Sequence, residues 1–143
     1  MNRLVEIVLV VLMLFIFTST ASADAVVQEG RPSPNAVRFT NIYYLTPRLS
    51  ITSAGRADCS GSVLLSSAAY SVELSVTLQQ SSGSGWTDVA SWTKTGPGVP
   101  EVAIAESQNV APGTYRVRAT ARVFSGGTLV ETASQYTSYM VYR

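Results

Sequence analysis

The amino-acid sequence predicts an all-β fold in which about seven or eight antiparallel strands form two packed sheets. In several segments, apolar and polar side chains alternate with a period of two, which is typical of strands with one buried and one solvated face. Clusters of Gly, Pro, Ser and Asn interrupt the alternation about every 8–12 residues, as expected for turns. After residue 35, no segment has the 3.6-residue apolar period of an amphipathic helix.

The first 23 residues predict a signal-peptide helix that is cleaved after Ala23. Arg3 supplies positive charge, Ile7–Phe17 is uninterruptedly apolar, and Ala21-Ser22-Ala23 is a small-residue cleavage site. An uncleaved membrane anchor is the alternative, although a spanning helix needs about 20 apolar residues. We therefore expect a secreted protein with no membrane attachment after cleavage.

Residues 24–35 contain Pro32 and Pro34 and predict a flexible lead-in to one domain over residues 36–135. The first strands are expected at residues 37–45 and 49–53, interrupted by Pro47. The next is expected at residues 57–65, with Cys59 on the inward side. Residues 71–80 show the clearest alternation, and Val72, Leu74, Val76 and Leu78 share its apolar face.

The second half of the domain continues this pattern. A Ser/Gly turn at residues 81–85 predicts a hairpin to a strand at 86–95, followed by a weaker strand at 99–107 with Val102 and Ile104 inward. Pro112-Gly113 opens a strand at 115–124, and a turn at 125–127 leads to the last strand at 128–134. Residues 136–143 form an aromatic C-terminal tail or an additional edge strand.

Composition excludes several functional classes. The net charge is +1, which gives no electrostatic reason to expect nucleic acid as a partner. The chain has no histidine, which removes the common nucleophilic triads and zinc sites, and its single cysteine cannot form an internal disulfide. We therefore expect no enzyme activity, no metal and no cofactor.

Trp86, Asp88 and Trp92 are the candidate ligand-binding residues. Trp86 and Trp92 are six positions apart, so on a regular strand they share a face, with Asp88 between them. They could cover the core, because tryptophan favours strands. Alternatively, they could form a flat platform for sugar rings, with Asp88 binding hydroxyl groups.

Arginines form a second feature on the strand at 115–124. Arg116, Arg118 and Arg122 lie on its polar face, and we expect Glu131 to face them from the next strand. This arrangement is typical of a solvated sheet face with cross-strand ion pairs. Alternatively, the arginines form a patch for an acidic partner.

The segment Pro112–Val117 resembles the start of strand F in immunoglobulin and fibronectin type III domains. The resemblance implies that Tyr115, two residues after Gly113, is the corner tyrosine that bonds back to the backbone. It also places Cys59 near the strand-B cysteine and Val117 at its partner position, so the inter-sheet disulfide of antibody domains is absent.

Residues 57–131 also resemble a family of small secreted Firmicute proteins of unknown function. The resemblance covers roughly half of the chain and implies an exported immunoglobulin-like domain with no assigned activity. It rests on Cys59-Ser60-Gly61, Gly85-Trp86, Val89, Trp92, Thr95-Gly96, Pro112–Arg116 and Gly126-Gly127.

Together, these patterns predict a secreted, non-catalytic sandwich that binds a protein or surface partner. A carbohydrate-binding module using Trp86 and Trp92 is one alternative, and a self-assembling extracellular subunit is another. The sequence specifies neither the ligand nor the oligomeric state.

Overall fold

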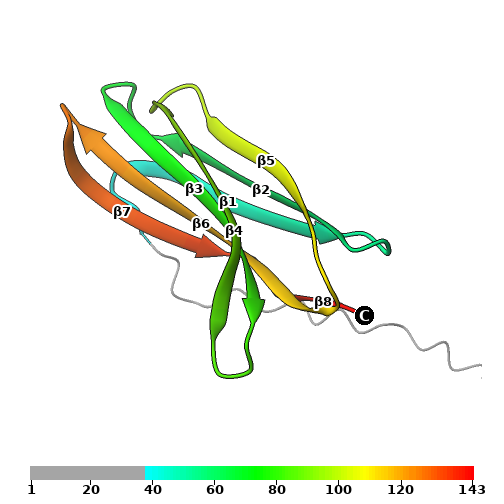
Figure 1. Ribbon diagram of the computed structural model, residues 1–143. Helices are drawn as coiled ribbons and strands as arrows, with labels where there is room; N and C mark the ends of the chain where they lie inside the picture. The colour runs from blue at the N-terminus through cyan, green and yellow to red at the C-terminus, as the bar shows by residue number, and fades with distance from the viewer. Residues whose placement is uncertain (1–37) are drawn as a thin grey trace, which may run out of the picture.

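The computed structural model describes residues 38–143, which form eight strands in two antiparallel sheets (Figure 1). The three-stranded sheet has the order β1 (Ile42–Ile51), β2 (Arg56–Leu65), β5 (Val102–Asn109). The five-stranded sheet has the order β4 (Trp86–Pro97), β3 (Tyr70–Ser81), β6 (Gly113–Ser125), β7 (Thr128–Tyr136), and β8 (Met140–Tyr142) also pairs with β6. The predicted all-β class is confirmed. The expected signal-peptide helix and lead-in, at residues 1–35, lie outside the described residues.

The two sheets pack face to face around one core, as in a β-sandwich. Along β2 and β6, buried residues alternate with residues that are at least partly exposed, as the sequence predicts. β3 alternates in the same way from Val72 to Val76, but Thr77 and Gln79 on its outer face are also buried. The largest fully buried side chains come from both sheets: Val63 and Cys59 from β2, Val72, Leu74, Val76 and Leu78 from β3, and Tyr115, Val117 and Val123 from β6.

The expected break at Pro47 is wrong. β1 runs without interruption from Ile42 to Ile51, and Pro47 pairs with Gly61 of β2. Proline cannot donate a backbone hydrogen bond, but β1 is an edge strand whose other side needs no partner. The position in the sheet therefore decides whether a proline ends a strand.

The start of β5 also differs from the expectation. The strand begins at Val102 rather than at residue 99, although Val102 and Ile104 are buried as predicted. The preceding segment crosses from one sheet to the other. Gly98 N donates to Tyr70 O at 2.7 Å, and Gly98 O accepts from Leu65 N at 3.0 Å. This crossing leaves Val99 exposed and outside the ladder.

Three edge strands carry a β-bulge. The pairing registers shift by one residue at Tyr43 in β1, at Val89 in β4 and at Val130 in β7. Each of these three extra residues is an exposed large hydrophobic side chain. Bulges interrupt the regular hydrogen-bonding row of an edge and so hinder pairing with another chain. They also reverse the face on which all following residues of the strand lie.

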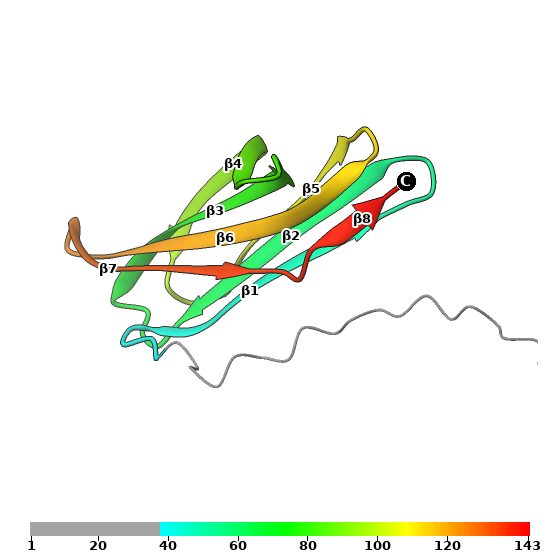
Figure 2. The ribbon, with the colours of Figure 1, turned by 90° about the horizontal axis from the view of Figure 1, so that it is seen from below.

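The C-terminal segment is an edge strand rather than a free tail. β8 continues in line with β7 along β6, as Figure 2 shows. Between them, Thr137 N donates to Val117 O at 2.9 Å, and Val117 N donates to Thr137 Oγ1 at 3.0 Å. The Tyr142 hydroxyl donates to Ser53 O at 3.4 Å, so the end of the chain contacts the turn between β1 and β2.

Candidate functional site

The two tryptophans lie on opposite faces of β4, so the expectation that they share a face is wrong. Trp86 pairs with Ser81 on the outer face of the five-stranded sheet, whereas Trp92 pairs with the buried Val76. The bulge at Val89 lies between them and reverses the alternation. Asp88 precedes the bulge and shares the outer face with Trp86.

Trp92 packs against the hydrophobic core and is partly buried. It also lines a shallow groove of about 330 Å³ between the edge strands β4 and β5, together with Lys94, Ile104 and Glu106. The position of Trp92 therefore agrees with the first of the two alternatives, in which it covers the core.

Trp86 contacts an arginine on the outer face of the five-stranded sheet. The guanidinium carbon of Arg116 lies 4.2 Å from the centre of the Trp86 ring and 4.4 Å from the centre of the Tyr136 ring. These three residues, the aromatic–arginine stack, come from β4, β6 and β7. Cation–π contacts of this kind hold a guanidinium in place and remove water from it.

A hydrogen-bonded chain continues from the stack across the same face. Arg116 Nε donates to Gln79 Oε1 at 2.9 Å, and Gln79 Nε2 donates to Asp88 Oδ1 at 2.7 Å. Arg118 Nη2 in turn donates to Asp88 Oδ2 at 3.3 Å. Gln79 is only 4% exposed although it lies on an outer face, because its neighbours cover it. Both ends of its amide are therefore paired.

Further cross-strand pairs lie on the same face. Hydroxyl groups form cross-strand pairs at 2.8–2.9 Å: Ser75 with Thr93, Thr77 with Ser91, and Thr120 with Ser134. Arg122 Nη1 lies 3.0 Å from Glu73 Oε1. Such pairs fix the side chains of a sheet face relative to one another.

Glu131 does not face the arginines, so that expectation is wrong. The bulge at Val130 places Glu131 opposite the buried Val123. Its carboxylate instead accepts hydrogen bonds from Thr40 N at 2.9 Å and Asn41 N at 2.7 Å, just before β1. The acidic partners of Arg118 and Arg122 are Asp88 and Glu73, respectively.

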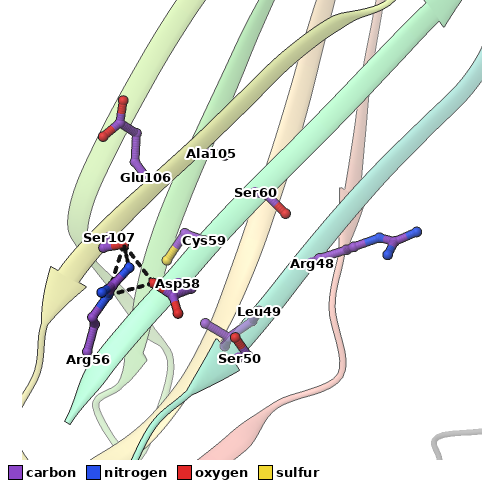
Figure 3. A pocket seen from close by; sticks show the side chains of 10 residues that line it. All are labelled: Arg48, Leu49, Ser50, Arg56, Asp58, Cys59, Ser60, Ala105, Glu106 and Ser107. Carbon is purple, nitrogen blue, oxygen red and sulfur yellow. Dashed lines mark hydrogen bonds and ion pairs between the residues drawn. The ribbon is translucent and has the colours of Figure 1, made fainter. Parts of the chain in front are cut away.

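The outer face of the three-stranded sheet contains a trough of about 530 Å³ (Figure 3). Its centre is formed by small side chains, including Ser60 and Ala105, and one end carries Arg56, Asp58 and Ser107. Asp58 Oδ1 accepts from Ser107 Oγ at 2.6 Å and from Arg56 Nε at 2.9 Å. The Ser107 hydrogen bond, helped by Arg56, lowers the pKa of Asp58.

Cys59 adjoins the trough, but its side chain is buried. It is only 1% exposed, and Sγ lies 3.9 Å from Ala57 O. Burial, with a smaller contribution from the Asp58 charge, raises the pKa of Cys59 to about 11. The thiol is therefore protonated at neutral pH, and the reactive thiolate is scarce.

Tyr115 and Gly113 form a packed corner at the start of β6. Tyr115 is 2% exposed, and its hydroxyl donates to Ala111 O at 2.7 Å. Burial raises the pKa of Tyr115. A Cβ atom on Gly113 would lie 2.7 Å from Gln80 Nε2 and 3.3 Å from the Tyr115 ring. Glycine at this position allows the ring to pack against the backbone.

Two residues that contact Arg116 were not among the candidates derived from the sequence. Tyr136 belongs to the segment expected to be a tail, and Gln79 is one of several polar residues on its strand. No local pattern separates them from their neighbours. Only the pairing of β3, β4, β6 and β7 brings them to Arg116.

No protein-family model and no curated protein matches the chain. Within residues 38–143, no three His, Cys, Asp or Glu side chains gather closely enough to hold a metal ion. The same residues contain no helix with the length and apolar character needed to cross a membrane.

Proposed function

We propose that this chain is an exported, non-catalytic domain of the immunoglobulin and fibronectin type III class. We further propose that it binds a protein or surface partner through the outer face of its five-stranded sheet. The observation that carries the binding proposal is the convergence of Trp86, Arg116 and Tyr136 from three strands onto one rigid face.

The strand order supports the proposed class. The immunoglobulin plan places strands A, B and E in one sheet and strands C, F and G in the other. The order β1-β2-β5 corresponds to A-B-E, and β3-β6-β7 corresponds to C-F-G. β4 pairs with β3 rather than β5, which is the arrangement of fibronectin type III domains.

The corner at Tyr115 gives independent support. In immunoglobulin-like domains, a tyrosine near the start of strand F bonds to the backbone a few residues upstream. Tyr115 lies near the start of β6 and bonds to Ala111 O. Cys59 of β2 and Val117 of β6 are both fully buried, as expected for the positions that a disulfide joins in antibody domains.

The state of the potential nucleophile supports a non-catalytic role. Cys59 is buried, its pKa is raised to about 11, and the chain has no histidine to act as its base. Binding by the stack has a clear physical basis, because Trp, Tyr and Arg are enriched among the residues that dominate interface energies. A rigid stack also loses little side-chain entropy when a partner binds.

Export is supported by the charged, apolar and small-residue order of residues 1–23. Expression of the full chain in a secreting host should release a protein whose mass corresponds to residues 24–143. Intact-mass spectrometry of the medium and the cell fraction measures this. Recovery of only the full-length chain in the cell fraction would contradict the proposal.

The binding proposal is tested by capture from surface extracts and culture medium of the source organism. A Trp86→Ser/Tyr136→Ser double variant should reduce recovery of the captured partner at least about tenfold, because it removes the interface anchors. Arg48→Ser on the other sheet is the matched control and should bind as the wild type does. Equal capture by all three proteins would contradict the assignment of this face.

A further inference from the structure

We propose that Arg116 receives a single carboxylate from an acidic segment of the protein partner. This inference rests on the binding function proposed above and names the chemistry of its centre. It follows from how Arg116 is held, from which of its donors are used and from the charges around it.

Arg116 is held in one arrangement before any partner binds. Trp86 and Tyr136 contact its guanidinium at 4.2 Å and 4.4 Å from the ring centres, and they come from strands on either side of β6. Gln79 fixes the rotation of the guanidinium within the stack, because Gln79 Oε1 accepts a hydrogen bond from Arg116 Nε at 2.9 Å. Gln79 is itself held by Asp88 and is almost fully buried. The side chain is therefore preorganised, which lowers the entropic cost of binding.

The terminal nitrogens of Arg116 are available for a ligand. Within residues 38–143, Nε has an acceptor, whereas Nη1 and Nη2 have none. A guanidinium presents its N–H groups as a planar fork that matches the two oxygens of a carboxylate. Because Nε is already occupied by Gln79, the paired Nη1 and Nη2 donors are the ones that a carboxylate would use.

The surrounding charges favour one carboxylate over a polyanion. Arg118 is paired with Asp88, and Arg122 is paired with Glu73. Arg116 is thus the arginine of this face that lacks an acidic partner among the described residues. A sulfated polysaccharide or an anionic membrane needs several unpaired cations and would approach Asp88 and Glu73 closely. An Asp or Glu side chain in a protein segment needs only one.

The rings beside Arg116 indicate what should flank that carboxylate. Tyr136 is 48% exposed, and Trp86 is partly exposed. Apolar side chains of the partner can pack on the ring edges and exclude water from the new ion pair. Exclusion of water strengthens such a pair. The expected partner segment therefore carries one acidic residue between apolar residues.

NMR titration of the isotopically labelled full chain tests this directly. The probe is the capped peptide acetyl-Leu-Glu-Leu-amide, and its matched control has Gln in place of Glu. We expect saturable shifts of the Arg116 Nε–H and Trp86 Nε1–H signals with the acidic peptide. The Gln peptide should bind roughly fivefold more weakly, because a neutral acceptor makes the weaker hydrogen bond.

Matched variants separate the roles of the arginines. Arg116→Gln should abolish the preference for the acidic peptide, whereas Arg122→Gln should keep it, because Arg122 is paired with Glu73 outside the stack. Arg116→Lys should keep part of the affinity, because a lysine retains the charge but not the fork. Thermal melting of each variant checks that it remains folded.

Three outcomes would overturn the carboxylate assignment. Equal binding of both peptides, with loss of both on Trp86→Ser, would leave the binding face intact but remove the role of the charge. Tighter binding of a heparin oligosaccharide than of the acidic peptide, dependent on Arg116, would assign the site to a polyanion. An absence of shifts in the stack with either peptide would also reject it, and the capture experiment would then decide separately whether this face binds a partner.

Discussion

The outer faces of the two sheets differ although both follow the same alternation of polar and apolar residues. On the five-stranded sheet, side chains of neighbouring strands contact one another through stacks, ion pairs and hydroxyl pairs. On the three-stranded sheet, small side chains such as Ser60 and Ala105 leave an open trough. The comparison shows that alternation determines which side chains point outward. The size and pairing of those side chains determine whether a face is rigid and covered or open.

The largest expected effect is a difference in thiol labelling rate between the two faces of β2. Cys59 points into the core, and its neighbour Ser60 points into the trough. In the native protein, a thiol reagent should label Cys59 at least about a thousandfold more slowly than in the unfolded protein, because labelling requires opening of the core. A Cys59→Ala/Ser60→Cys variant should be labelled rapidly in the native state. Stopped-flow absorbance measures both rates, and rapid native labelling of Cys59 would contradict the register of β2.

A second prediction compares one polar residue from each face. Gln79→Ala should lower the free energy of unfolding by about 1–2 kcal/mol, because it removes hydrogen bonds to two charged groups. Ser60→Ala in the trough should change it by less than about 0.5 kcal/mol. Urea denaturation followed by tryptophan fluorescence measures both. Equal effects would mean that the covered face is no more tightly coupled than the open one.

A third prediction compares two tyrosine hydroxyl groups. Tyr115→Phe should destabilise the protein by about 1 kcal/mol, because it leaves the Ala111 carbonyl without its buried donor. Tyr44 is on the three-stranded sheet, and its exposed hydroxyl donates to Glu101. Tyr44→Phe should therefore have a smaller effect. Thermal melting of both variants is the measurement, and an unchanged melting temperature for Tyr115→Phe would argue against the corner assignment.

The smallest expected effect is a pH dependence in the trough. The pKa of Asp58 lies below the ordinary aspartate value of 3.8, mainly because of the hydrogen bond from Ser107. The folded state therefore favours the ionised form, and the resulting stabilisation is present above pH 3.8 and is lost as the pH falls through the lower folded pKa. Below pH 3.8, the stability of Asp58→Asn should fall less steeply than that of the wild type. Urea denaturation at several pH values measures the stability of both proteins. Equal dependence of their stability on pH would contradict this role of Asp58.

The sequence was most informative where strands are regular and central. β3 and β6 lie in the middle of their sheet, and the inward residues expected of β3 are all buried: Val72, Leu74, Val76 and Leu78. The candidate site was predicted only in part. Trp86, Asp88 and the arginines were singled out, but the pairing of Trp86 with Trp92 and of Glu131 with the arginines was wrong. Both errors have the same cause, because a bulge in an edge strand inserts one residue and reverses the side on which later residues lie.

The sequence by itself determined the all-β class, the two-sheet arrangement and the inward faces of the central strands, because a period of two is a local property of the backbone. Only the tertiary structure decided the continuity of β1 through Pro47, the separation of Trp86 from Trp92 and the contact of Arg116 with Tyr136. These features depend on which strands are neighbours and in what register they pair. Strand neighbours and register arise from contacts between residues far apart in the chain, and the local alternation of residues does not specify those contacts.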